Sequence, residues 1–152
     1  MAEPCWRFES SVDSDASPEF AWKYWTDIRN WSDPPARFSL EGPFAPGARG
    51  ATCIPGQEPL AWVIAEMDPG KSAAITMQLD RAEMRFHWRF EGLSERRTRL
   101  TQSIALTGEN AGAYQEAASV FAANLPGGMK KMAAAMAEAE AALGSSEQGT
   151  LI

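Results

Sequence analysis

Cysteine and histidine are almost absent from this sequence, and their scarcity limits the chemistry it can perform. The 152 residues include two cysteines, Cys5 and Cys53, and one histidine, His87. Neither cysteine belongs to a Cys-x-x-Cys pair, and so few soft ligands argue against a zinc or haem site. We therefore expect no metal, no cofactor, and two cysteines that are reduced and semi-buried.

Positive charge and long apolar runs are also in short supply. Fourteen Lys and Arg residues against 20 Asp and Glu residues give a formal net charge of -6, whereas nucleic-acid binding draws most of its affinity from a clustered basic surface. No apolar run approaches the roughly 20 residues that span a bilayer, and Glu3 and Pro4 stand where a secretory signal would be basic. We expect no nucleic-acid partner, no transmembrane segment and a cytoplasmic location.

Large aromatic residues, in contrast, are abundant and clearly patterned. Residues 83–91 read E-M-R-F-H-W-R-F-E and place Met84, Phe86, Trp88 and Phe90 on one face of an extended chain. Side chains of a strand alternate between two faces, so this run predicts an antiparallel strand with one apolar face and one charged face. Three aromatic side chains on one face require a cover.

The N-terminal region predicts a strand followed by a short, broken helix. Apolar and polar residues alternate over residues 5–13, Ser17 is a good N-cap, and Pro18 suits the first helical position. A stripe of apolar residues at helical spacing follows, and the Asp33-Pro34-Pro35 cluster ends the helical region. We expect the helix to break near Asp27.

The middle of the chain predicts an antiparallel meander. Short segments with strand character are separated by Pro, Gly, Asp and Ser residues typical of turns. The predicted strands cover residues 36–42, 50–54, 60–67, 72–79, 83–91 and 98–107.

Good helix formers then dominate residues 111–143 and predict a long C-terminal helix. Pro126 within it predicts a kink, with two separate helices as the alternative. The sheet-facing stripe is predicted by apolar residues that recur at helical spacing: Met129, Met132, Met136, Ala139 and Leu143. Gly144 is the predicted stop, so residues 1–143 form the single predicted domain and residues 144–152 a flexible tail.

Several segments carry a resemblance to a known family. The motif S-P-E-F-A-W-K-Y-W-T-D-I-R-N-W spans residues 17–31, and G-P-F-A-P-G, A-E-M-D-P-G-K and L-P-G-G-M follow in order. The sequence resembles the polyketide cyclase/dehydrase-like branch of the START-like helix-grip (SRPBCC) superfamily over about residues 6–143. Trp22, Asp27 and Trp31 match the family's motif. Relatives often continue with Trp-Pro-x-Trp, but Ser32, Asp33 and Pro34 follow here, which implies an entrance loop of a different shape.

The resemblance implies an α+β helix-grip fold, in which a curved antiparallel seven-stranded sheet wraps around the long C-terminal helix and a short broken helix follows the first strand. It also implies a cavity between sheet and helix that takes apolar or amphipathic small molecules. Members of the family include lipid and hormone binders and aromatic polyketide cyclases. The fold alone leaves the activity undetermined.

Residues predicted to face inward are the candidate ligand-binding set. Two interpretations stay open: the alanine-rich segment 133–142 leaves a cavity against the sheet, or it lets the helix pack closely so that the same residues form an ordinary core. Gln102 is the most informative of them, because an inward amide must bond to protein, water or ligand. The candidates are Tyr24, Trp31, Trp62, Ile75, Met77, Phe86, Trp88, Gln102, Ile104, Met129, Met132 and Met136.

Catalytic signals are weak. The parity of His87 places it beside Arg85 and Arg89 on the solvent face, and no Ser-His-Asp set or spaced carboxylate pair is visible. The first functional hypothesis is binding or carriage of a hydrophobic small molecule or lipid-like metabolite, with no catalytic residue assigned. The alternative is an aromatase/cyclase-type enzyme acting on a polyketide-like substrate, and a third possibility is a partner-binding adaptor. Whether the protein is an enzyme, and its oligomeric state, stay open.

Overall fold

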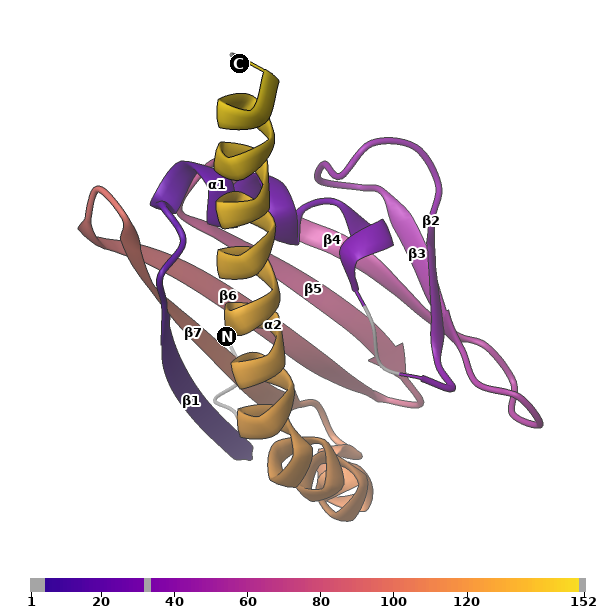
Figure 1. The fold of residues 1–152 in the computed structure, drawn as a ribbon. Coiled ribbons are helices and arrows are strands. Elements are labelled where there is room, and N and C mark those ends of the chain that lie inside the picture. Colours follow the sequence, from indigo (N-terminus) through magenta and orange to yellow (C-terminus); the bar gives the residue numbers. More distant parts are fainter. Residues whose placement is uncertain (1–4, 32–33, 151–152) are drawn as a thin grey trace.

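Seven antiparallel strands form one curved sheet in the order β1-β7-β6-β5-β4-β3-β2. The computed structural model describes residues 5–31 and 34–150, and the long C-terminal helix lies across one face of the sheet (Figure 1). We call this face the inner face and the opposite one the outer face. The strands are β1 (Trp6–Ser14), β2 (Arg37–Leu40), β3 (Arg49–Cys53), β4 (Leu60–Asp68), β5 (Ser72–Leu79), β6 (Ala82–Ser94) and β7 (Arg97–Thr107). The predicted α+β helix-grip fold is confirmed.

The broken helix after the first strand is also as predicted. Helix α1 (Pro18–Trp25) begins at Ser17, whose hydroxyl accepts a hydrogen bond from the Phe20 N–H. A separate 3₁₀ turn, η1 (Ile28–Asn30), follows, and the Asp27 carboxylate accepts from the Arg29 N–H at its start. The break therefore falls at Asp27, because this side chain caps a new turn. Ser32 and Asp33 lie outside the described residues.

The C-terminal helix differs from the prediction at its end. A 3₁₀ turn, η2 (Ala111–Tyr114), leads into α2 (Gln115–Thr150), which is one helix with Pro126 inside it. The alternative of two separate helices is wrong. The orange part of α2 runs at an angle to its golden part in Figure 1, in agreement with the predicted kink.

Gly144 does not end α2, so the predicted stop is wrong. A helix-ending glycine usually adopts a positive φ, and Gly144 is not among the residues that do. A glycine that keeps helical dihedrals costs only about 1 kcal/mol relative to alanine, so the helix continues to Thr150. The division into a domain of residues 1–143 and a flexible tail of residues 144–152 stays a prediction.

Helix α2 is held over one side of the inner face, where it packs against β1, β7 and α1. The Ser14 hydroxyl donates to the Ala133 carbonyl at 2.7 Å. Both the Ser17 hydroxyl and its N–H donate to the Glu140 carboxylate, at 2.6 and 2.8 Å. These bonds fix the two helical covers to each other and to β1. None of the helices in the described part of the chain combines the length and apolar character needed to cross a membrane.

Candidate ligand-binding site on the inner face

The inner-face row of β6 is covered at both ends and open in the middle. Met84 and Phe90 are 2% and 5% exposed, but Phe86 and Trp88 between them are only half-buried. Strand β6 lies between β5 and β7, so the exposed area of these two rings cannot come from a sheet edge. It must come from the space above the inner face, which we call the inner hollow.

Gln102 lies beside this opening. It is paired with Trp88 of β6 and with Ser10 of β1, so the three side chains share the inner face. Gln102 is 6% exposed, and its side chain makes no hydrogen bond to another described residue. Among the described residues, every side-chain nitrogen or oxygen that is completely shielded from solvent has a hydrogen-bond partner. The amide must therefore keep access to solvent, and in the middle of the sheet that access leads through the inner hollow.

Aromatic side chains close one end of the inner hollow. Trp25 of α1 is 1% exposed, and its ring centroid lies 5.2 Å from that of Trp88 and 5.4 Å from that of Phe90. The Trp31 indole donates to the Trp25 carbonyl at 2.7 Å and packs on the Trp62 ring at a centroid distance of 5.7 Å. The break at Asp27 thus turns the chain so that α1 and the residue after η1 contribute to the same aromatic wall.

Helix α2 supplies the opposite wall. Met129 and Met136 are buried, whereas Met132 between them is half-buried. Leu143 is 54% exposed, so its predicted place in the sheet-facing stripe is wrong. Nearer the start of α2, the Phe121 ring is 41% exposed and meets the Phe86 ring edge-on at 6.1 Å. Flexible methionines and an exposed aromatic ring are typical of a surface that can adapt to an apolar ligand.

The structure brings the predicted residues together around the inner face, but they differ in how deeply they are buried. The buried members are Trp62, Ile75, Met77, Gln102, Ile104, Met129 and Met136. The half-buried members are Tyr24, Trp31, Phe86, Trp88 and Met132. That these residues bind a ligand stays a prediction.

Two residues near the site were missed from the sequence. Trp25 belongs to the apolar stripe of its helix and so carried a signal of burial, but nothing in the sequence placed it against Trp88. Phe121 lies before Pro126, outside the predicted methionine stripe, and only the course of α2 brings it to Phe86.

His87 lies on the outer face, as its parity predicts, and takes no part in the inner site. It is paired across strands with Ser103 and flanked along β6 by Arg85 and Arg89. Burial lowers the pKa of His87, and the neighbouring charges of Arg85 and Arg89 lower it further. Its neutral form is therefore favoured near neutral pH.

Two further features bear on the search for a site. Two hollows of the described residues, of about 280 and 460 Å³, lie on the outer face and at the β5–β6 turn. Neither is on the inner face, so the case for the inner hollow rests on the exposure of Phe86, Trp88 and Gln102. Cys5 and Cys53 are free and exposed, so the prediction that they are semi-buried is wrong. They lie at strand ends, and the Cys5 thiol accepts a hydrogen bond from the Gln115 amide of α2 at 3.7 Å.

Comparison with known proteins agrees with this geometry. The family model described as polyketide cyclase / dehydrase and lipid transport matches residues 6–137. The chain is similar to a point mutant of norcoclaurine synthase from Thalictrum flavum solved with a transition-state analogue, with a TM-score of 0.71 and 8% identity over 92% of this chain and 99% of that one. No curated protein matches the chain.

Two bacterial structures are also similar. The Zhui aromatase/cyclase from Streptomyces sp. R1128 has a TM-score of 0.54 and 18% identity over 68% of each chain. A protein from Nitrosomonas europaea has a TM-score of 0.69 and 13% identity over 90% of this chain and 96% of that one. At these identities the likeness shows a shared fold.

Proposed function

The chain belongs to the polyketide cyclase / dehydrase and lipid transport family, and from this premise we propose that it binds or carries a hydrophobic small molecule or lipid-like metabolite in the inner hollow. The observation that carries this proposal is the exposure pattern of β6. Phe86 and Trp88 are the centre of an inner-face row, yet they retain exposed area between two buried neighbours.

Apolar burial is the energy source that this site offers. Removing apolar surface from water contributes about 25 cal/mol per Å², and the ring faces of Phe86 and Trp88 together with the Met132 thioether supply such surface. Affinity then depends on the fit of the ligand more than on its charge.

Gln102 adds one point of polar recognition. Its amide lies beside the Trp88 ring and the Ser10 side chain, and the residue is 6% exposed. An amide both donates and accepts, so it suits a ligand with a single carbonyl or hydroxyl group on an otherwise apolar body. That group orients the ligand, because leaving a desolvated amide unpaired costs about 1–3 kcal/mol.

An aromatase/cyclase-type enzyme acting on a polyketide-like substrate is the second candidate. The family description and the likeness to the Streptomyces aromatase/cyclase support it. Such chemistry needs a group that transfers protons in contact with the substrate. The Gln102 amide can position a substrate but does not take up or release protons in this pH range, so binding is the function that the geometry favours.

Binding is tested by displacement of an environment-sensitive fluorophore with fatty acids and aromatic polyketide-like compounds, and by native mass spectrometry of the purified protein. Replacing Met132 by Trp should fill the inner hollow and weaken binding at least about tenfold, because a larger side chain occupies the ligand's volume. Leu143→Trp, on an exposed position of the same helix, is the matched control and should bind normally.

A Met132→Trp variant that folds and still binds with unchanged affinity contradicts the inner site. Trp88→Glu places a charge on the same surface and should also abolish binding. Consumption of a bound polyketide-like compound, followed by chromatography, favours the enzyme over the carrier.

A further inference from the structure

The outer face carries a trough that the proposed function does not use. Strand β7 presents only small side chains there, those of Thr101, Ser103 and Ala105. Its two neighbours, β6 and β1, present long ones. Neighbouring strands lie about 4.8 Å apart, so the two rows of long side chains stand roughly 10 Å from each other across a low floor.

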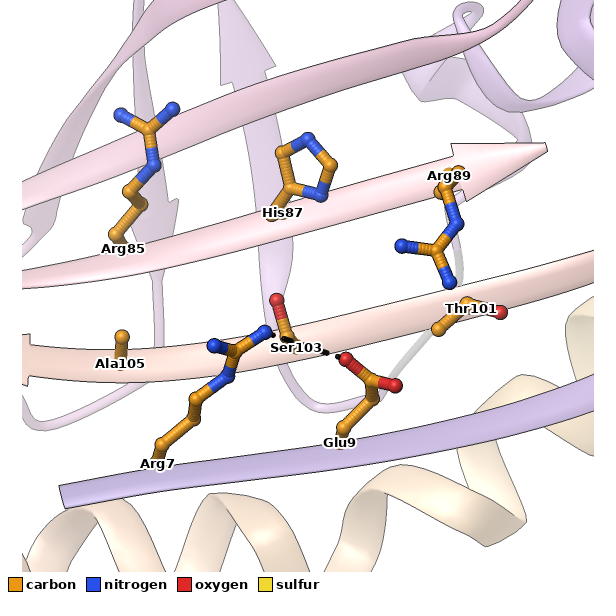
Figure 2. Close-up of a pocket in the computed structure, with 8 residues that line it drawn as sticks. All are labelled: Arg7, Glu9, Arg85, His87, Arg89, Thr101, Ser103 and Ala105. Atoms are coloured by element: carbon orange, nitrogen blue, oxygen red, sulfur yellow. Dashed lines mark hydrogen bonds and ion pairs between the residues drawn. The ribbon is translucent and has the colours of Figure 1, made fainter.

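The walls of this trough are mainly cationic. Arg85, His87 and Arg89 form the β6 wall, and Arg7 and Glu9 form the β1 wall. Cross-strand pairing sets the arrangement, since His87 and Glu9 both lie opposite Ser103. The trough is open to solvent and has a volume of about 280 Å³. Figure 2 shows the guanidinium groups of Arg7 and Arg89 extending over the β7 floor from its two sides.

Each arginine already contacts one carboxylate, but this contact occupies only part of its guanidinium group. Arg7 meets Glu9 at 3.4 Å through one terminal nitrogen. The other two pairs, Arg85 with Glu66 at 2.7 Å and Arg89 with Glu91 at 3.1 Å, likewise join a single nitrogen to a single oxygen. A guanidinium has five N–H groups, so most of the donors stay free for another acceptor.

The chain as a whole is acidic, with a formal net charge of -6, so three arginines on the two strands that flank β7 are a local concentration of positive side chains. The floor adds hydroxyl groups from Ser103 and Thr101, of which the Thr101 hydroxyl is hydrogen-bonded to Ser11 at 2.9 Å. Guanidinium and hydroxyl donors that converge on one space are the groups that bind oxyanions with shape-matched, charge-assisted hydrogen bonds.

We propose that the outer trough binds a doubly charged oxyanion, of the kind carried by a small phosphorylated metabolite. The lining itself holds three arginines and one glutamate, and Glu66 and Glu91 beside it offset part of that positive charge. The guanidinium N–H groups outside these pairs supply the hydrogen bonds for the anion. This site lies on the opposite face of the sheet from the inner hollow, so it is independent of the proposed function.

His87 provides a direct readout of the proposal, because it is the only histidine in the chain. Its pKa is lowered mainly by burial and then by Arg85, Arg89 and Arg7, against the raising effect of Glu66. A dianion in the trough adds negative charge beside the ring and favours the protonated form, so binding must raise the pKa of His87. By the same linkage, the affinity for the anion must rise as pH falls through that pKa.

Further side chains face His87 from the strands on either side of β6. Glu9 faces it from β1, and Ser103 lies opposite it on β7. On the β5 side its partner is Ala74, flanked on the same face by the uncharged Ser72 and Thr76.

The experiment follows the His87 ring signals by NMR as a function of pH and sulfate concentration, with sodium chloride at equal ionic strength as the reference. Sulfate stays a dianion throughout, so its own titration cannot imitate the effect. We expect a saturable upward shift of the His87 pKa in sulfate. Inorganic phosphate should act likewise above its second ionisation, and acetate should act much more weakly.

Arg89→Gln should raise the sulfate concentration at half-saturation about tenfold, because it removes charge-assisted hydrogen bonds. Arg96→Gln, at the exposed β6–β7 turn, removes the same charge outside the trough and should leave binding unchanged. Three results would overturn the proposal and indicate an ordinary solvated charged surface. They are a His87 pKa shift that does not saturate, a shift equal to that in chloride, or a shift that both substitutions reduce equally. Fluorophore displacement from the inner hollow is unaffected by either result.

Discussion

The two faces of β6 differ completely although their residues alternate along one strand. Phe86 meets Phe121 of α2 and Trp88 packs on Trp25 of α1, whereas the side chains of Arg85, His87 and Arg89 point the other way and line a polar trough. A shift of one residue in strand register would exchange the two sets. The comparison teaches that a single alternating pattern specifies two chemically opposite surfaces.

The two faces also form their hollows differently. On the inner face, Phe86 and Trp88 stay partly exposed because α2 packs on β1 and β7 and leaves the centre of β6 incompletely covered. The outer trough exists because long side chains flank short ones on adjacent strands, with no second layer involved. Substitutions on the inner face should therefore change the stability of the protein. Substitutions on the outer face should mainly change the surface charge.

The largest contrast is expected between two adjacent residues of β7. Ile104 is fully buried on the inner face between Phe8 and Phe86, and Ser103 lies on the outer face. Ile104→Ala should lower the free energy of unfolding by about 2–5 kcal/mol through lost burial and a new cavity. Ser103→Ala should change it by less than about 0.5 kcal/mol. Urea denaturation measures both, and equal losses would contradict the assignment of faces.

An intermediate effect is expected where Trp62 packs on the backbone of Gly50. A Cβ atom at Gly50 would overlap the Trp62 ring, whose indole donates to the Thr52 hydroxyl at 3.1 Å. Gly50→Ala should cost about 1–3 kcal/mol because the ring must move, and the change in its packing with Trp31 should alter the near-ultraviolet circular dichroism. Gly112→Ala, where the added methyl meets open space, is the control and should preserve both signals.

The smallest effect is expected on the outer face, at Asp13. Its carboxylate accepts a hydrogen bond from Arg99 at 2.9 Å and lies 3.5 Å from Arg97. The hydrogen bond from Arg99, with help from the charges of both arginines, lowers the pKa of Asp13 below its ordinary value of 3.8. A lowered carboxyl pKa contributes stability that is complete above the ordinary value and is lost as pH falls through the lowered one.

Asp13→Asn should therefore be slightly less stable than the wild type at neutral pH, and the difference should close below about pH 4. Thermal melts across this range test it, with Asp15→Asn, a more exposed partner of Arg97, as the control. A stability difference that is constant with pH would exclude the ion pair as its source.

Much of the fold was predictable because local chemistry and tertiary structure agree. Alternation predicted β5 with its observed ends, and Ser17 with Pro18 predicted the start of α1. The end of α2 was not predictable in this way. Gly144 is a common stop signal, but the helix passes through it, because one unfavourable residue costs too little to end a helix by itself.

For the candidate site, the sequence predicted which face of the sheet each side chain lies on, but not which helix residues pack over that face. The alternating pattern placed Gln102 and Trp88 on one face, and the register confirms that they are neighbours. No sequence rule placed Trp25 over Trp88, or the Phe121 ring beside Phe86. Such contacts join segments tens of residues apart, and only the packing of the helices on the sheet creates them.

By itself the sequence determined the element order, the strand faces and the helix start, because each depends on neighbours a few residues away. Only the tertiary structure decided that the centre of the inner face stays open and that three arginines meet on the outer face. The reason is geometric: a hollow is the space between elements, and its shape depends on where α2 rests and on which strands β7 has beside it.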